Sequence, residues 1–346
     1  MENSFDDIEQ LSDRERQVLL SIIEQHVLTA LPVGSRTLSK SGELNLSPAS
    51  IRNVMSDLEE RGMIGHPHTS AGRIPTDLGY RYYVNSIMEG ISLSGEERAL
   101  IEQQFTETLP SAIEELVRKS SHILSRISQQ LAIVSAPTLG RGVLQRLELV
   151  QVASDKIMVI LSIRSGIVKS IILQIQTEIN RRQLDEISVL LNDRLGGLTL
   201  QDIRETFADR LRNAGSDDNG IIRLFVESSD RLFSERLESD AVCIDGIESI
   251  TRQPEFGNPD RMRNIIQLVE NQNVIVHVLD SLSGGSALTI RIGREINAAM
   301  LSDYSIIAAP YRVGQLNGTI SIVGPKRMHY PRMIAIVDYL ARLISV

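Results

Sequence analysis

The chain has 346 residues, of which 42% are hydrophobic, enough to build the cores of two or three domains. Its formal net charge of −8 argues against indiscriminate coating of nucleic acid, because counterion release requires clustered lysine and arginine. The apolar runs are far shorter than a membrane span, and the acidic start lacks the basic region of a signal peptide. We therefore expect a globular, multi-domain, cytoplasmic protein with no membrane contact.

Cysteine and histidine usage gives no support for catalysis or metal binding. The single cysteine, Cys243, lies in an apolar, strand-like run, where a buried structural thiol is favoured over a nucleophile. His66 and His68 could begin a metal site, but no further His, Cys or acidic cluster nearby completes it. Ser283-Gly-Gly-Ser286 lacks both the Gly-Lys-Ser/Thr of a phosphate loop and the three glycines of a dinucleotide fingerprint. We expect no enzyme activity, no metal and no cofactor.

The N-terminal segment predicts two successive helices. Ser12-Asp-Arg-Glu15 is a capping box, and the apolar residues after it recur at steps of three and four residues. Ser35 opens a short second helix, and Gly42 ends it.

A third helix is predicted from about 48 to 61, because Ser47 supplies an N-cap and Pro48 suits the first helical position. Arginine can pair bidentately with guanine and asparagine with adenine, and the first turn of a recognition helix enters the major groove first. Ser47 and Ser50 suit phosphate contacts at the positive helix end. An ordinary amphipathic helix with a solvated face is the alternative for this helix alone. The buried face is expected to hold Ile51, Met55 and Leu58, and the opposite side Ala49, Ser50, Arg52, Asn53 and Ser56.

Residues 62–76 predict a strand, a glycine-rich turn and a return strand, followed by a helix containing Gly79-Tyr-Arg-Tyr-Tyr83. Three helices and a hairpin indicate a winged helix-turn-helix. Residues 34–83 hold six basic and five acidic residues, so the acidic excess lies elsewhere, as expected for a small local DNA-binding surface. On the wing, the candidates for DNA contacts are His68, Thr69, Ser70 and Arg73.

The chain resembles the HrcA family of heat-inducible transcription repressors. The resemblance is strongest in Ser50-Ile-Arg-Asn53, in the run from Pro67 to Thr76 and in Gly79-Tyr-Arg-Tyr82, and it returns in Ile292-Gly-Arg-Glu295 and from Gly318 to Pro325. It implies binding of double-stranded DNA at an inverted-repeat operator, the CIRCE element, ahead of chaperone operons. It also implies that the GroEL chaperonin supports the active state of the repressor.

Beyond the wing, a second capping pattern, Ser94-Gly-Glu-Glu97, predicts a helix to about 108, and another helix is expected from Pro110 to about Leu131. Residues 147–152, 157–163 and 167–175 are rich in Val and Ile and predict an antiparallel meander. Residues 180–238 return to helical spacing, which indicates an inserted block. Strand-like runs resume at Val242, Val274, Leu288, Ile306 and Thr319.

The expected fold class is therefore α+β and multi-domain. The resemblance implies a GAF-like α+β domain made from both flanks and carrying an inserted, mainly helical dimerisation domain. We expect the winged helix at 1–90, the first GAF-like part at 91–178, the insert at 179–240 and the second GAF-like part at 241–346.

The favoured hypothesis is a homodimeric repressor whose two winged helices meet operator half-sites related by the two-fold axis of the dimer. If the repressor is marginally stable, heating lowers its folded fraction, and other unfolded proteins compete for chaperonin. The repressor would then leave the operator. The alternatives are a winged-helix scaffold that binds protein and a regulator that senses a small molecule.

Overall fold

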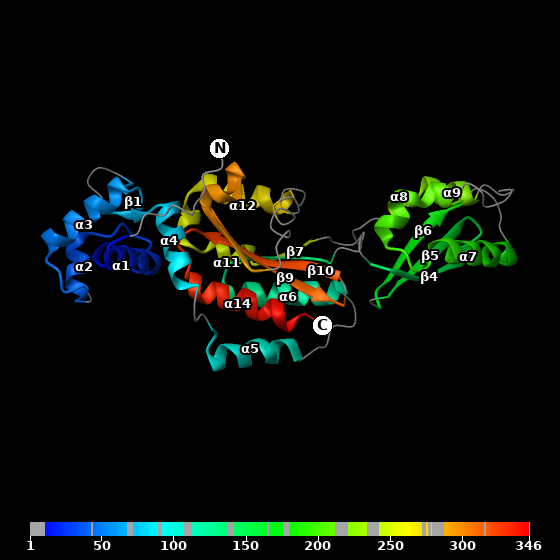
Figure 1. Cartoon of the computed structure of the whole chain (residues 1–346), viewed down its shortest axis with the longest axis horizontal. Helices are drawn as coiled ribbons and strands as arrows, with labels where there is room; N and C mark the ends of the chain where they lie inside the picture. Colours follow the sequence, from blue (N-terminus) through cyan, green and yellow to red (C-terminus); the bar gives the residue numbers. More distant parts are fainter. Residues whose placement is uncertain are drawn as a thin grey trace.

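The computed structural model is a mixed α/β protein whose lobes lie in a row (Figure 1). The first four helices lie at one end, a five-stranded sheet in the middle and a three-stranded sheet at the other end. No described helix combines the length and the apolar character needed to cross a membrane. The structure describes residues 11–345 except 43, 68–71, 89–91, 107–112, 138–141, 165, 176–179, 212–220, 234–241, 272–274, 276–277, 279–286 and 315.

The N-terminal lobe, residues 11–88, begins as the capping pattern predicts. The backbone N–H of Ser12 donates to Glu15 Oε2 at 2.8 Å, and the N–H of Glu15 donates to Ser12 Oγ at 3.3 Å. Gly42 ends the second helix in the left-handed region, at φ 79°. The elements of this lobe are α1 (Asp13–Thr29), α2 (Ser35–Ser41), α3 (Pro48–Glu60), β1 (Ile64–Gly65), β2 (Ile74–Pro75) and α4 (Asp77–Ile87).

The central lobe is an antiparallel sheet in the order β7-β3-β10-β9-β8, with helices on both faces (Figure 1). Alternate residues of each strand face opposite layers, so that Ala132 and Val134 join the core with α6 and α14, while Leu131 and Ile133 join the core with α11 and α12. The strands are β3 (Leu131–Ser135), β7 (Val242–Asp245), β8 (Thr289–Ile292), β9 (Tyr304–Val313) and β10 (Leu316–Pro325). The helices are α5 (Gly95–Thr106), α6 (Ile113–Ser128), α11 (Ile247–Thr251), α12 (Pro259–Glu270) and α14 (Tyr330–Leu343).

Two expectations for this lobe were wrong. The helix expected to reach Leu131 ends at Ser128, because Gln129 adopts φ 55° and Leu131 then opens the interior strand β3. The strand-like run at Val274 begins outside the described residues, and Ile275 and Val278 beyond it are helical.

The third lobe is a three-stranded antiparallel meander covered on one face by helices, and the meander itself confirms the prediction. Its strands share one hydrophobic cluster with the helices that follow, so the boundary expected between 178 and 179 falls inside a single core. No described residue of the meander belongs to the central sheet. The elements are β4 (Leu144–Ala153), β5 (Lys156–Ile163), β6 (Val168–Gln174), α7 (Arg181–Leu195), α8 (Leu200–Leu211), α9 (Ile221–Glu227) and α10 (Ser229–Leu232).

The third lobe is inserted between two neighbouring strands of the central sheet. The chain leaves β3 at Ser135 and returns in β7 at Val242, and these two residues are antiparallel partners. A segment that leaves and re-enters at adjacent positions leaves the pairing of the host sheet intact.

The N-terminal lobe packs on the central sheet through α4, within one continuous hydrophobic cluster. The rings of Tyr80 and Tyr83 both contact the ring of Tyr330. Arg81 forms an ion pair with Glu295 in which the side chains are only 15% and 8% exposed. Such a desolvated, hydrogen-bonded pair fixes the orientation of α4 more firmly than a surface pair would.

Candidate nucleic-acid interface

Helix α3 presents one apolar and one polar face, as its sequence predicts. Ile51, Met55 and Leu58 are buried against the rest of the lobe, together with Val54. The predicted contact residues Arg52, Asn53 and Ser56 are all exposed. The structure therefore brings these three side chains to one open helix surface.

The N-terminus of α3 is closed by Ser47, which explains why this residue is a serine. Ser47 Oγ accepts from the N–H of Ser50 at 3.1 Å and donates to Ser50 Oγ at 3.0 Å. The Ser47 hydroxyl is thus occupied by capping, whereas the Ser50 hydroxyl makes no other hydrogen bond to a described residue. Of the two serines suggested for phosphate, Ser50 is the better placed donor.

Two cations that the sequence interpretation did not nominate lie on α2, which packs directly against α3. Arg36 and Lys40 are four residues apart and exposed, so they share one face of the short helix. Neither they nor Arg52 has an acidic partner among the described residues. The signal in the sequence was this i, i+4 spacing of two basic residues in the helix before α3.

The hairpin β1–β2 is short, and its tip lies outside the described residues. Three of the four wing candidates, His68, Thr69 and Ser70, fall in that tip. The fourth, Arg73, pairs with the connection between α1 and α2 by exchanging two backbone hydrogen bonds with Val33, at 2.8 and 2.9 Å.

Arg73 is held by an acidic residue of α3, which the sequence interpretation missed. Its Nε donates to Glu59 Oε2 at 2.9 Å, and His66 Nδ1 lies 2.6 Å from Glu59 Oε1. Partial burial alone would raise the pKa of Glu59, but the hydrogen bonds from His66 and Arg73 outweigh it and leave this pKa below its usual value. Glu59 therefore stays ionised and ties the base of the β1–β2 hairpin to the end of α3.

Charge is unevenly distributed along α3. Its first half carries Arg52 and the positive end of the helix dipole, whereas Asp57, Glu59 and Glu60 crowd its last turn. An anionic partner is attracted to the first half and repelled by the second, except where Glu59 is neutralised. The arrangement suits a polyanion approached by the N-terminal end of the helix.

Comparison with known proteins supports the resemblance over almost the whole chain. A family model described as "HrcA protein C terminal domain" matches residues 114–334. The chain is 40% identical over 344 residues to the "Heat-inducible transcription repressor HrcA" of Chlorobium phaeobacteroides, covering 97% of both chains. It is 42% identical over 348 residues to the protein of the same name from Chlorobium luteolum, again covering 97% of both.

A solved structure has the same fold over nearly its full length. It is described as the crystal structure of a hypothetical protein, is 26% identical, and aligns with a TM-score of 0.63 over 97% of this chain and 98% of its own. The sequence matches and the structural match thus both extend over nearly the whole chain. The chain belongs to the HrcA family of heat-inducible transcription repressors.

Proposed function

We propose that the chain is a transcription repressor that binds an inverted-repeat operator of the CIRCE type in double-stranded DNA. The relatives share the name of heat-inducible repressor over 97% of the chain. The observation that carries the proposal is the open face of α3, where Arg52 and Asn53 stand exposed beside a capped helix N-terminus. Such a protein works where the chromosome is, which in a bacterium is the cytoplasm.

In this proposal α1 to α3 and the hairpin β1–β2 form a winged helix-turn-helix, with α3 as the recognition helix in the major groove. Arg52 and Asn53 read base edges, with Ser56 beside them. Ser50, Arg36 and Lys40 contact phosphates, and the wing residues 68–70 and Arg73 reach the backbone or the minor groove.

We also propose a revised domain division. The five-stranded sheet with helices on both faces is the GAF-like domain, built from 91–135 and 242–346. The insert, 136–241, includes the β4–β6 meander as well as the helices, because they share one core. The winged helix keeps the range 1–90.

The test is operator binding by Arg52→Ala and Asn53→Ala. Losing a bidentate base contact costs about 1 to 3 kcal/mol, so each variant should bind the inverted repeat about 5- to 150-fold more weakly. Affinity for unrelated duplex should change much less, since phosphate contacts remain. Arg118→Ala is the matched control, because Arg118 is an exposed arginine on α6, away from the N-terminal lobe. If both variants protect the operator like the parent, α3 is not the recognition helix.

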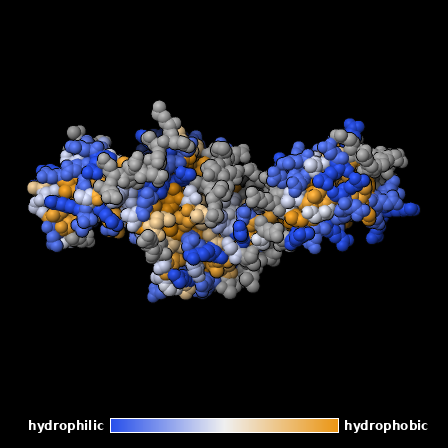
Figure 2. Space-filling view, in the orientation of Figure 1, coloured by the Kyte–Doolittle hydropathy of each residue, from blue (hydrophilic) through white to orange (hydrophobic). Residues whose placement is uncertain are grey.

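We propose that the repressor acts as a homodimer joined through the insert. One face of the β4–β6 sheet is covered by helices, and the other exposes apolar side chains: Val150 is 39%, Val168 60% and Ile172 52% exposed. Val150 pairs with Met158, and Met158 pairs with Ile172. Val150, Met158 and Ile172 therefore form an apolar row across the three strands. Figure 2 shows this lobe as mostly hydrophilic, with apolar surface between the polar side chains. A second copy with the same row would cover it by two-fold symmetry.

The resemblance further leads us to propose that the GroEL chaperonin supports the active repressor and that heat empties the operator. A marginally stable repressor loses folded fraction on heating, and occupied chaperonin cannot restore it. Footprinting across the heat-shock range, with and without chaperonin, tests this. Full occupancy by the purified protein throughout that range would contradict it.

A further inference from the structure

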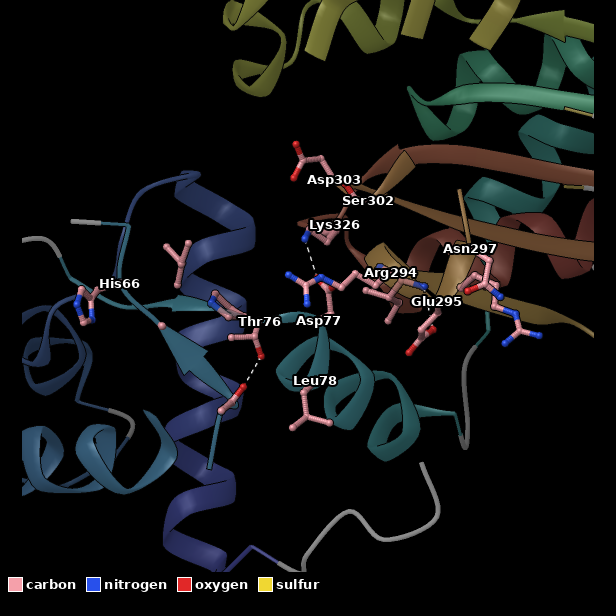
Figure 3. Close-up of a pocket in the computed structure, with 16 residues that line it drawn as sticks. His66, Thr76, Asp77, Leu78, Arg294, Glu295, Asn297, Ser302, Asp303 and Lys326 are labelled. Atoms are coloured by element: carbon pink, nitrogen blue, oxygen red, sulfur yellow. Dashed lines mark hydrogen bonds and ion pairs between the residues drawn. The ribbon is translucent and has the colours of Figure 1, made fainter. Parts of the chain in front are cut away.

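A cleft of about 960 Å³ separates the base of the wing from the central sheet (Figure 3). One wall consists of Gly62, Gly65 and His66, together with β2 and the first residues of α4; the other consists of β8 and the 3-10 turn η3 (Gly293–Ile296). The cleft lies outside the surface that α3 offers to DNA. Its volume is that of a typical small-molecule site, and such sites are frequent where two structural units meet.

Every acidic side chain that lines the cleft already has a basic partner. Asp77 Oδ1 lies 2.6 Å from Lys326 Nζ, across the cleft from one wall to the other. Glu295 pairs with Arg81, and Asp303 Oδ2 lies 3.2 Å from Arg261 Nε. The carboxylates are therefore neutralised and leave little demand for a cationic ligand.

Two arginines of the lining remain without an acidic partner among the described residues. Arg291 and Arg294 are both exposed, and Arg294 uses only its backbone N–H, which donates to Asp77 Oδ2 at 3.1 Å. Figure 3 shows Arg294 beside the linked pair of Asp77 and Lys326. Lys326 of the lining and the neighbouring Arg81 and Arg261 balance the three carboxylates, so the charges of Arg291 and Arg294 are left over. Guanidinium groups bind phosphate and carboxylate in bidentate fashion.

The remaining lining suits an organic molecule better than a bare ion. Ile74 and Leu78 are half-buried apolar side chains on the wall formed by the N-terminal lobe, and Asn297 is an exposed amide on the other. A cleft walled on both sides encloses a small molecule, whereas DNA backbone lies along elements that protrude into its grooves.

We propose that this cleft binds a small organic anion that bears a phosphate or carboxylate group, held by Arg294 and Arg291. Because its walls belong to the N-terminal lobe and to the central sheet, a bound anion bridges the two and adds to the contacts of α4 that hold the orientation of the winged helix. A ligand that prefers one orientation shifts the equilibrium toward it and thereby changes operator affinity, and by linkage the operator changes the affinity for the ligand by the same factor.

The experiment is calorimetric titration and thermal melting of the full-length protein with three probes: inorganic phosphate, adenosine monophosphate and citrate. We expect at least one organic probe to bind and to raise the melting temperature. Arg294→Ala should weaken that binding about 10-fold or more, since a charge-assisted contact is lost. Arg118→Ala should bind like the parent. The comparison of phosphate-bearing and carboxylate-bearing probes assigns the anionic group.

These measurements need no operator, so they stand apart from the test of the DNA-binding proposal. Absence of binding by all three probes, or equal binding by Arg294→Ala, overturns the site. If inorganic phosphate binds and neither organic probe does, the proposal that the ligand is an organic anion is wrong. If Arg294→Ala weakens operator binding with no probe present, the arginine serves DNA and the small-molecule proposal fails. A probe that binds without changing operator affinity overturns the regulatory role.

Discussion

Gly293 and Asp77 approach each other so closely that a Cβ added to Gly293 would lie 2.2 Å from Asp77 Oδ2. Gly293 also has φ +55°, which L side chains rarely adopt. The carboxylate cannot easily turn aside, because Lys326 Nζ holds its Oδ1 at 2.6 Å and the N–H of Arg294 donates to Oδ2 at 3.1 Å. The junction between α4 and the central sheet therefore depends on a glycine at this position.

Gly293→Ala is expected to lower the free energy of unfolding by about 2 kcal/mol or more, from left-handed strain plus displacement of Asp77. Thermal melting and urea unfolding measure this loss. Gly166→Ala is the matched control: Gly166 has φ +87° but no atom within 4 Å of the added Cβ, so only the backbone cost of about 1 kcal/mol applies. If the two variants lose equal stability, the contact with Asp77 contributes nothing.

The N-terminal lobe could be predicted closely from sequence because its signals are local. Ser12 and Glu15 cap α1 as a reciprocal pair, and Ser47 and Pro48 start α3. The buried positions Ile51, Met55 and Leu58 follow directly from helical periodicity. Each of these features depends on residues within a turn or two of one another.

The central lobe was harder to predict because its signals depend on distant partners. The segment Leu131–Ser135 is a short apolar run directly after a helix, and periodicity cannot distinguish a buried strand from a further helical turn. Helices α12 and α14 were not anticipated, since they interrupt or follow strand-like runs. The pairing of Arg73 with Glu59 joins residues 14 apart, and that of Arg81 with Glu295 joins residues 214 apart. Sequence alone shows neither partner.

His26 is expected to make stability depend on pH. Burial lowers the pKa of His26 below its ordinary 6.5, and the nearby Arg327 lowers it further. The unfolded chain therefore takes up a proton below pH 6.5 that the folded chain resists, so stability is full above 6.5 and falls as the pH falls through the lowered pKa. Carboxylates such as Glu15, whose pKa is lowered by hydrogen bonds from Ser12, lose their contribution only at more acidic pH.

Unfolding measured from about pH 7 to about pH 5 checks this, with His26→Gln as the comparison. Glutamine can keep a hydrogen bond to the Tyr80 hydroxyl, which lies 2.8 Å from His26 Nδ1. The parent should lose more stability than the variant over this interval. Identical pH profiles of the parent and the variant would show that His26 does not cause the pH dependence of the free energy of unfolding.

Ile172→Asp is expected to separate the proposed dimer. Ile172 is 52% exposed at the β6 end of the apolar row on the open face of the sheet, and a carboxylate there would be buried unpaired in the interface. Such burial costs about 3 kcal/mol, which raises the dimer dissociation constant about 100-fold. Analytical ultracentrifugation over a concentration series measures the change.

The matched control is Val189→Asp. Val189 is 62% exposed on α7, the helix that covers the opposite face of the same sheet. It receives the same charge at similar exposure but points away from the proposed seam. Equal dissociation by both variants would indicate general destabilisation of the insert rather than loss of one surface.

Glu59→Gln tests whether Arg73 serves the DNA or only the fold. In the parent, Glu59 competes with the DNA for Arg73, at 2.7 Å between Arg73 Nη2 and Glu59 Oε2, so a contact of Arg73 with a phosphate is weakened. Glutamine removes the charge and frees the guanidinium for DNA. Each added phosphate contact steepens the slope of log affinity against log salt by about 0.9. We expect that change in a salt titration of operator binding.

Asp57→Asn separates this effect from a general loss of negative charge. Asp57 is an exposed acid on the same helix, two residues before Glu59, and its side chain has no basic partner among the described residues. Its removal weakens repulsion of the DNA but releases no arginine. A steeper slope in Glu59→Gln alone assigns Arg73 to a phosphate. Equal slopes in both variants mean that Arg73 stays with the hairpin, and that the role of Glu59 is to hold the hairpin against α3.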